Sequence, residues 1–308
     1  MKKMGFAEAI DDALAMAMAE DENIIIFGED VHALRMNIRV RFGMDRVLAA
    51  PISESAFLGA AVTAAMSGLK PVVEIMLVDF IGTAMDALLN HAAKVKFFSG
   101  GKWNVPLVIR AACGGWYGDG GQHEQSLWGW LAHIPGLKVV VPSNPADAGG
   151  LMLSALKDPD PVVFLEHKLL SDYWLEYMGS GGRKTVKFDI PSEGVRGMVP
   201  KKWHPVPLGT AEFIRKGQDI TMISVGVGVH RALEAAEHLE KNGLFSSVLD
   251  LRSVSPLDKE KICEAVAQTG RMLVVDEDNC GFGLSGELAA VVLEENIQCK
   301  FARVCTET

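Results

Sequence analysis

The sequence is poor in features that mark secreted, zinc-stabilised or membrane proteins. Its 308 residues include five cysteines, and no two of them form a Cys-x-x-Cys pair. This pattern argues against a disulfide framework or a structural zinc site and fits a reducing compartment. The chain opens without a signal-peptide pattern, and no apolar run has the length of a membrane span. We therefore expect a cytoplasmic protein with no membrane partner.

An excess of positive charge is also missing. The formal net charge is −9, so a broad surface for nucleic acid is not expected. Hydrophobic residues make up 49% of the chain and charged residues 22%, as in globular proteins with ample core material. The length favours two domains over one.

Strand and helix patterns alternate in two parts of the chain. Apolar runs typical of buried strands are 23–30, 69–76, 105–111, 219–226, 246–253 and 271–278, and helical patterns lie between them. Alternation of this kind predicts an α/β fold with mostly parallel sheets covered on both faces. Two helix starts are expected from local chemistry, with Ser143 as an N-cap and Pro256 in a first turn.

The regular pattern breaks between these two parts. Residues 171–206 show no steady period and include the glycine-rich GSGGRK and the stretch KKWHPVP. Residues 167–206 carry seven basic and four acidic side chains, whereas both flanking segments are acidic. We divide the chain into a domain at 1–170, a linker or excursion at 171–206, and a second α/β domain at 207–308.

A single charge opens one otherwise apolar helix pattern. In PISESAFLGAAVTAAMSG, residues 51–68, the only charged residue is Glu54. An ionised carboxylate is costly to bury without a partner. From the residues alone, the favoured interpretation is that Glu54 complements the helix N-terminus, which is worth roughly 0.3–1 kcal/mol.

Several stretches closely resemble one family, over nearly the whole chain. They include NIIIFGEDV, RVLAAPISESAFLG, KFFSGGKWNVPLVIR, GGQHEQS, HIPGLKVVVPSNPADA, DPDPVVFLEHKLL, LDLRSVSPLD and MLVVDED. The family is the beta subunit of heterotetrameric thiamin-diphosphate-dependent 2-oxoacid dehydrogenases, of the pyruvate, branched-chain and acetoin types. The resemblance implies a pyrimidine-binding domain followed by a transketolase C-terminal-like domain.

The resemblance implies catalytic roles for two residues. Glu54 matches the carboxyl group that hydrogen-bonds the pyrimidine nitrogen of thiamin diphosphate and so favours the imino tautomer, which removes the thiazolium proton. His123 matches the histidine that faces the substrate and the lipoyl group, where an imidazole can exchange a proton near neutral pH. Without the resemblance, a loop histidine such as His123 is usually just exposed.

The resemblance also implies cofactor and ion positions. Phe80 matches the aromatic against the pyrimidine ring, Met76 a second pocket wall, and Ile52 and Glu29 match residues near the cofactor. In the family, Glu29 belongs to an acidic, water-lined path between two active sites. Ordinary core roles for Phe80 and Met76, and a solvated loop position for Glu29, are the alternatives. A structural potassium ion is implied at Leu107, Ala155, Leu156, Asp158 and Asp160, mainly through backbone carbonyls.

The family keeps its diphosphate and magnesium motif on another chain. Here the GDG at 118–120 matches only the opening of that motif, because a single asparagine, Asn144, follows in the right region. The resemblance therefore implies half of an active site. An alpha subunit would hold Mg2+ in an alpha2beta2 heterotetramer with beta–beta contacts, and a lipoyl acyltransferase would receive the acyl group.

Other functions remain open at this point. Acetoin cleavage uses the same cofactor logic, a non-catalytic subunit would keep the fold alone, and a fragment of a transketolase-type sugar enzyme would use the same glutamate. After GED the family has a glycine-rich turn, whereas this chain has VHALRMNIRVRFG. The substrate is not fixed by the sequence, because the alpha chain would supply much of its pocket.

Overall fold

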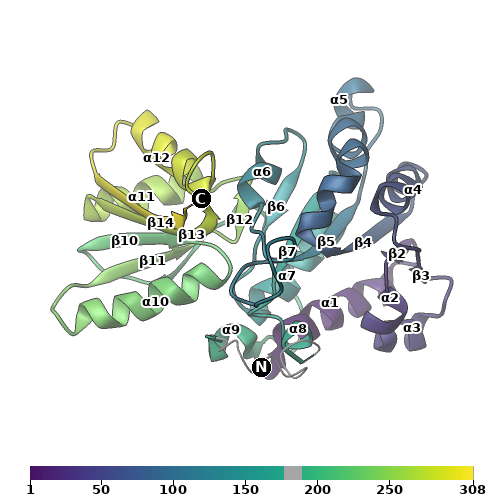
Figure 1. Cartoon of the computed structure of the whole chain (residues 1–308), viewed down its shortest axis with the longest axis horizontal. Helices are drawn as coiled ribbons and strands as arrows, with labels where there is room; N and C mark the ends of the chain where they lie inside the picture. Colours follow the sequence, from purple (N-terminus) through teal and green to yellow (C-terminus); the bar gives the residue numbers. More distant parts are fainter. Residues whose placement is uncertain (177–188, 308) are drawn as a thin grey trace.

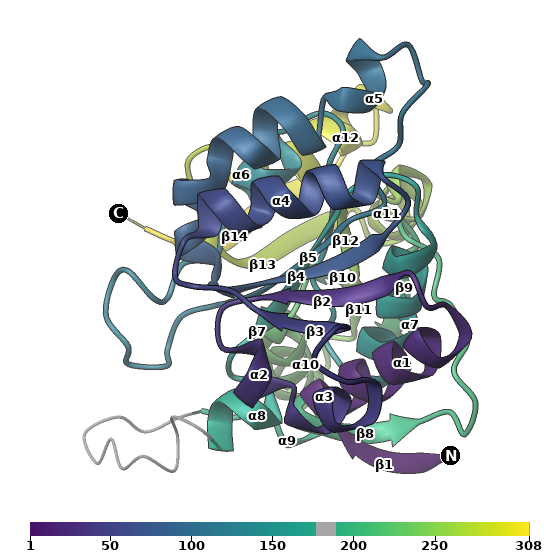
Figure 2. The same cartoon turned by 90° about the vertical axis from the view of Figure 1, so that its right-hand side faces the viewer.

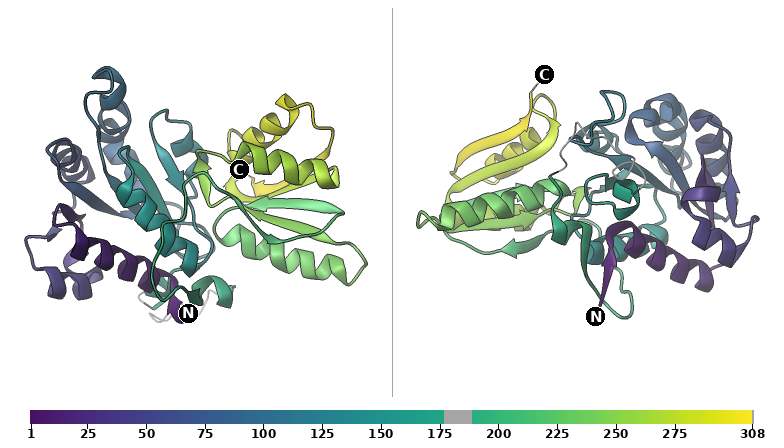
Figure 3. Two further views of the ribbon diagram at one scale, coloured as in Figure 1. Left: turned by 180° about the vertical axis from the view of Figure 1, so that it is seen from behind. Right: turned by 60° about the horizontal axis from the view of Figure 1, so that its bottom comes forward.

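Two α/β units lie side by side in the computed structural model, which describes residues 1–176 and 189–307 (Figure 1). The first unit is coloured purple to teal and the second green to yellow, and both views in Figure 3 show them packed beside each other. Of the linker expected at 171–206, residues 177–188 lie outside the described residues. The expected α/β fold with mostly parallel sheets is confirmed.

The first unit is built on a seven-stranded sheet in the order β12-β6-β7-β5-β4-β2-β3. Its six parallel strands are β2 (Ile24–Gly28), β3 (Val47–Ala49), β4 (Lys70–Leu77), β5 (Val108–Cys113), β6 (Lys138–Val140) and β7 (Val162–His167). Figure 2 shows α4 (Glu54–Met66) on one face, and α1 (Phe6–Glu20) and α7 (Pro145–Lys157) on the other. Because helices cover both faces, the strands are apolar along most of their length.

Shorter helical segments connect these elements. They are α2 (Val31–Leu34), α3 (Met36–Phe42), η1 (Val78–Ala84), η2 (Asp86–Ala92), α5 (Val95–Phe98), α6 (Trp128–Ala132), α8 (Asp172–Trp174) and α9 (Ser192–Val195). The helical pattern over 83–98 is not one regular helix. The Ala93 N–H donates to the Leu88 carbonyl five residues earlier, at 3.0 Å, which is the hydrogen-bond pattern of a π-helix, and η2 is such a helix.

The second unit has a five-stranded sheet in the order β14-β13-β10-β11-β9. Its strands are β9 (Glu212–Arg215), β10 (Ile220–Ser224), β11 (Ser246–Asp250), β13 (Arg271–Asn279) and β14 (Lys300–Thr306), and its helices are α10 (Val227–Glu240), α11 (Lys259–Thr269) and α12 (Leu284–Glu294). Strand β9 is antiparallel to β11 and the other pairs are parallel.

Strand exchange ties the two units together. Strand β12 (Ser253–Ser255) leaves the second unit and pairs antiparallel with β6 of the first sheet. At the N-terminus, β1 (Lys2–Gly5) pairs with β8 (Arg196–Val199), which follows the segment between the units. Across residues 1–176 and 189–307, none of the helices has the length and apolar character that crossing a membrane requires.

Two expected helix starts are wrong by a few residues. Asn144, not Ser143, caps α7, because its side chain accepts the Asp147 N–H at 3.0 Å while Ser143 donates to Asp250. Helix α11 begins at Lys259 behind Asp258, whose side chain accepts the Lys261 N–H at 3.1 Å, so Pro256 precedes the first turn. In both cases the side-chain oxygen nearest the free N–H groups determines the start.

Candidate active site

Several of the expected site residues lie at or just after the carboxyl ends of the central parallel strands. Glu29 directly follows β2, Met76 lies near the end of β4, and Phe80 follows in η1. A glycine-rich segment, residues 114–127, follows β5 and is called here the glycine loop. Since parallel strands end at one edge of a sheet, residues distant in the sequence meet at this edge.

Close approach of strands makes this edge compact. Gly28, with φ of +159°, lies so near β4 that an added Cβ would stand 2.3 Å from the Glu74 carbonyl oxygen. A side chain at this position would push β2 and β4 apart. The glycine therefore sets the spacing of the strands that carry Glu29 and Met76.

Glu54 is buried at the first turn of α4, with 9% of its surface exposed. Its neighbours in the helix, Phe57 and Leu58, belong to the apolar core. The single proton of the Thr83 hydroxyl is shared between the Phe80 carbonyl oxygen, at 2.9 Å, and Glu54 Oε2, at a long 3.4 Å. The carboxyl group is thus desolvated but weakly bonded, which leaves it capacity for a further hydrogen-bond partner.

His123 of the glycine loop lies against Phe80. The two ring centroids are 5.5 Å apart, and the rings are perpendicular, a favourable edge-to-face contact. Gln125 holds the loop to η1 by donating to Asp79 Oδ1 at 2.8 Å, while Asp79 Oδ2 is buried without a hydrogen-bond partner. The structure therefore brings Phe80 and His123 together and leaves one buried acceptor beside them.

Glu29 lies within electrostatic reach of Glu54. Partial burial, followed by repulsion from Asp30 and Glu54, raises the pKa of Glu29. Glu29 and Met76 also line a small cavity of about 40 Å³. Among the expected cofactor residues, Ile52 is the exception, because 76% of its surface is exposed.

The residues expected to bind potassium already have other partners. Lys138 Nζ lies 2.6 Å from both oxygens of Asp158, and Lys96 Nζ lies 2.6 Å from Asp160 Oδ1. The backbone carbonyls of Leu107 and Ala155 accept the N–H groups of Val162 and Asp158. Lysine ammonium groups therefore neutralise both carboxylates.

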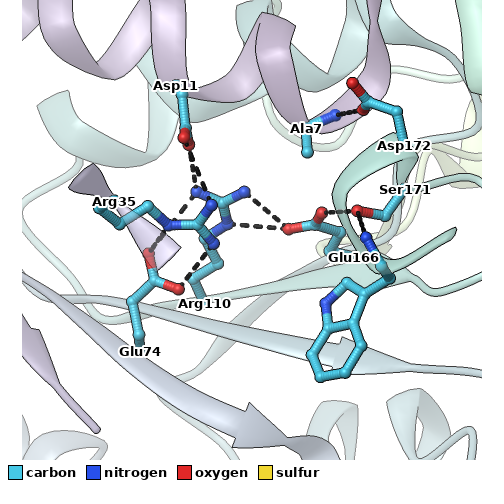
Figure 4. A network of polar contacts seen from close by, with 9 residues as sticks. Ala7, Asp11, Arg35, Glu74, Arg110, Glu166, Ser171 and Asp172 are labelled. Carbon is cyan, nitrogen blue, oxygen red and sulfur yellow. Dashed lines mark hydrogen bonds and ion pairs between the residues drawn. The ribbon is translucent and has the colours of Figure 1, made fainter. Parts of the chain in front are cut away.

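Two buried arginines, Arg35 and Arg110, also line this small cavity. Figure 4 shows the carboxylates of Asp11, Glu74 and Glu166 around them. Arg35 binds Glu74 through Nε and Nη2, at 2.6 and 2.8 Å. Arg110 lies opposite Glu74 in the β4–β5 register, and it donates to Asp11 at 2.7 Å and to Glu166 at 2.7 and 2.9 Å. These side chains come from α1, the end of α2 and three strands.

Charge pairing in this network outweighs the effect of burial. Desolvation alone would lower the pKa of Arg110 and raise that of Glu74, yet the pKa of Arg110 is raised and that of Glu74 is lowered. The opposing shifts arise because each charge has an opposite charge beside it. Arg110 and Glu74 therefore stay ionised in the protein interior.

We expect Arg110→Met to lower the free energy of unfolding by about 3–5 kcal/mol, because it leaves three buried carboxylates with one guanidinium. Arg196→Met is the matched control, since Arg196 and its partner Glu8 are exposed at 57% and 43%; it should change stability by about 1 kcal/mol or less. Chemical denaturation measures both. Equal effects of the two substitutions would contradict a structural role for the network.

Sequence reasoning missed three residues near the glycine loop. His167 ends β7, and its Nε2 lies 2.6 Å from Oε2 of Glu277 in β13. Lys168 is buried and donates from Nζ to the His123 carbonyl. The signals were EHK at a strand end and DED at another, but only the fold brings these strand ends together.

Metal ligands do not cluster in the described part of the chain. Among residues 1–176 and 189–307, no three histidine, cysteine, aspartate or glutamate side chains stand close enough to hold a metal ion. The GDG at 118–120 lies within the glycine loop, five residues after β5 ends.

The chain is similar to known proteins over nearly its full length. Residues 2–172 match the family described as transketolase, pyrimidine binding domain, and residues 209–308 match transketolase, C-terminal domain. In Bacillus subtilis, it is 38% identical to the acetoin:2,6-dichlorophenolindophenol oxidoreductase subunit beta over 310 residues, covering 95% of this chain and 84% of that one. It is 37% identical to the pyruvate dehydrogenase E1 component subunit beta over 303 residues, covering 96% and 87%.

A solved structure shares the fold. It is described as a split gene transketolase, an inactive beta4 tetramer, and it aligns with a TM-score of 0.76 at 21% identity, covering 99% of this chain and 90% of that one. A third relative, the 2-oxoisovalerate dehydrogenase subunit beta of Bacillus subtilis, is 38% identical over 300 residues, covering 96% and 85%.

Proposed function

Because the chain belongs to the transketolase-related family of dehydrogenase beta subunits, we propose that it is the beta subunit of the thiamin-dependent first component of a 2-oxoacid dehydrogenase complex. The reaction is decarboxylation of pyruvate or a branched-chain 2-oxoacid and transfer of the acyl group to a lipoyl domain. The observation that carries this proposal is the meeting of Glu54, Phe80 and His123 at one edge of the first sheet.

The residues at this edge fit the pyrimidine half of thiamin diphosphate. Glu54 is buried and has one long hydrogen bond, so its carboxyl group is available to form a hydrogen bond with a ring nitrogen. Phe80 offers an apolar ring beside it, and Glu29 adds a second carboxyl group in electrostatic reach. When bound, the cofactor would supply the electron sink that lets a 2-oxoacid lose carbon dioxide. Met76 and Ile52 would complete the walls of the pocket.

His123 would act on the substrate side of the site. Its ring contacts Phe80, and its backbone carbonyl is fixed by Lys168, so its position is restrained at both ends. A histidine can release or take up a proton near neutral pH. We propose that it donates a proton to the lipoyl sulfur that leaves when the lipoyl S–S bond breaks, while the other sulfur takes the acyl group.

An alpha subunit is proposed as the partner that holds Mg2+ and the diphosphate. Relatives named as beta subunits belong to components with more than one kind of chain. Exposed apolar side chains support a further covered surface, among them Ile52 at 76%, Phe97 at 80% and Trp103 at 57%. We propose an alpha2beta2 heterotetramer with a beta–beta contact, acting on a lipoyl acyltransferase.

Finer assignments follow the same reasoning. A structural potassium ion, if bound, would use the backbone carbonyls of Leu107, Ala155 and Leu156 and those of Asp158 and Asp160, and not the two carboxylates, which have lysine partners. The five cysteines are free, which supports a cytoplasmic location. We keep the domain division at 1–170 and 207–308, with 171–206 between them, as part of this proposal.

Acetoin cleavage is the second candidate function, favoured by the 38% identity to an acetoin oxidoreductase beta subunit. Coexpression with a candidate alpha chain, followed by cofactor-dependent assays on pyruvate, branched-chain 2-oxoacids and acetoin, distinguishes the two. Consumption of a 2-oxoacid with acylation of a lipoyl domain supports the first proposal. Turnover of acetoin alone supports the second, and no turnover of any of them contradicts both.

We expect the isolated chain to bind thiamin diphosphate at least about tenfold more weakly than the assembled enzyme, because the proposed site contributes only contacts to the pyrimidine half. Isothermal titration calorimetry with magnesium present, on the chain alone and on the coexpressed complex, measures the difference. Tight one-to-one binding by the chain alone would contradict the shared site and favour a real cofactor role for GDG at 118–120.

A further inference from the structure

A carboxylate of the second unit reaches the base of the glycine loop in the first. Glu277 in β13 accepts a hydrogen bond from the Gly115 N–H, and its Oε2 lies 3.5 Å from the Ser126 hydroxyl. The same oxygen is 2.6 Å from His167 Nε2, and the side chains of His167 and Glu277 are 0% and 19% exposed. One carboxylate thus touches both ends of the loop and the strand beside it.

The hydrogen-bond pattern assigns the state of this pair. The Leu169 N–H donates to His167 Nδ1 at 3.2 Å, so Nδ1 is the unprotonated nitrogen and Nε2–H points to Glu277. Burial acts to raise the pKa of Glu277, but the electrostatic attraction of His167, together with the hydrogen bonds from His167 and Gly115, outweighs it, and the pKa is lowered. Glu277 therefore remains a carboxylate that can accept several hydrogen bonds at once.

The two ends of the glycine loop are hydrogen-bonded to each other, and they lie next to the His167–Glu277 contact. The Gly114 N–H donates to the Gln125 carbonyl at 3.0 Å, which brings the two ends of the loop together. Gly114 has φ of +98°, and an added Cβ would stand 2.0 Å from His167 Nε2. Only a glycine allows the loop to leave β5 directly over the His167–Glu277 contact.

Lys168 fixes the other part of the loop. Its Nζ lies 4.9 Å from the centroid of the Tyr117 ring and donates to the His123 carbonyl. His167 and Lys168 are consecutive, so one strand end serves both the base of the loop and the segment that carries His123. Such anchors matter because the loop has five glycines, which have much conformational entropy to lose.

We propose that Glu277 is a positioning residue that fastens the glycine loop to the second unit and thereby holds His123 against Phe80. The catalytic consequence rests on the proposed function, whereas the restraint on the loop does not.

Hydrogen exchange on the full chain tests the restraint directly. In Glu277→Ala, amides in residues 115–126 should exchange about 10- to 100-fold faster, as expected for losing hydrogen bonds to a charged group. Amides of β10 should exchange as before. Glu277→Gln keeps an acceptor oxygen for Gly115 and His167 and should restore most of the protection. Glu294→Ala, which removes an exposed carboxylate at the end of α12, is the matched control and should change neither region.

Kinetics with the alpha partner then test the effect on His123. Glu277→Ala should slow lipoyl acylation by about tenfold or more while cofactor affinity stays within about twofold, and Glu277→Gln should recover most of the rate. Unchanged exchange in the loop, equal loosening of β10, or no recovery with glutamine would each overturn the proposal. A loosened loop in a protein whose wild type acylates no lipoyl domain would overturn the proposed function and leave the restraint standing.

Discussion

Glu54→Gln is expected to lower turnover of the assembled enzyme by about 100- to 10,000-fold while leaving fold and assembly intact. The amide has nearly the shape of the carboxyl group and still accepts the hydrogen bond from Thr83. It cannot deliver a proton to a ring nitrogen, so the loss falls on the chemical step. Measurement of turnover at saturating cofactor, with thermal unfolding of the same samples, separates the two effects.

A matched control tests the alternative role of Glu54 at a helix N-terminus. Glu260 also lies in the first turn of a helix, α11, but it is exposed and far from the glycine loop in the chain. Glu260→Gln should cost at most about 1 kcal/mol of stability and no activity. If Glu54→Gln keeps near-wild-type turnover and loses as much stability as the control, Glu54 only complements the N-terminus of α4 and has no catalytic role.

The sequence could predict the alternation of elements because the long strands of the central sheet are apolar over most of their length. The runs at 24–28 and 108–113 are nearly fully buried, as parallel strands covered on both faces must be. Helix boundaries were less accurate, because a cap depends on which side-chain oxygen reaches the free N–H groups. Asn144 reaches them in α7, and the neighbouring Ser143 bonds Asp250, 107 residues away in the sequence.

The candidate site divides in the same way. Glu54 stands out in the sequence because a single charge interrupts an apolar pattern, and its family resemblance supplies a role. The contact of Phe80 with His123 joins η1 to the glycine loop, which no local sequence pattern connects. The pairing of His167 with Glu277 spans 110 residues and two sheets, so it depends on how the units pack.

Buried charges are the clearest case of what periodicity cannot reveal. Arg110 and Glu74 lie within strands that are otherwise apolar, and each residue alone looks like an interruption. Their register in adjacent parallel strands puts them opposite each other, and α1 adds Asp11 from above the sheet. A charge inside a buried strand therefore indicates a partner in a neighbouring element, but the sequence does not identify it.

His123→Ala should slow acylation of a lipoyl domain by about 100- to 10,000-fold, the range expected for losing one general acid–base group. Cofactor affinity should stay within about twofold, because Glu54 and Phe80 carry the proposed pyrimidine contacts. His123 contacts the Phe80 ring but is not one of the groups proposed to contact the pyrimidine. The backbone carbonyl bonded to Lys168 is kept in the variant, so the loop remains anchored. The paired measurement is cofactor affinity and acylation rate, with the alpha chain present.

His133→Ala provides the control, since His133 is an exposed histidine at the end of α6. It should leave both quantities within about twofold of wild type, in line with most surface substitutions. An unchanged acylation rate in His123→Ala would mean that His123 only packs against Phe80, and the proton would have to come from another group.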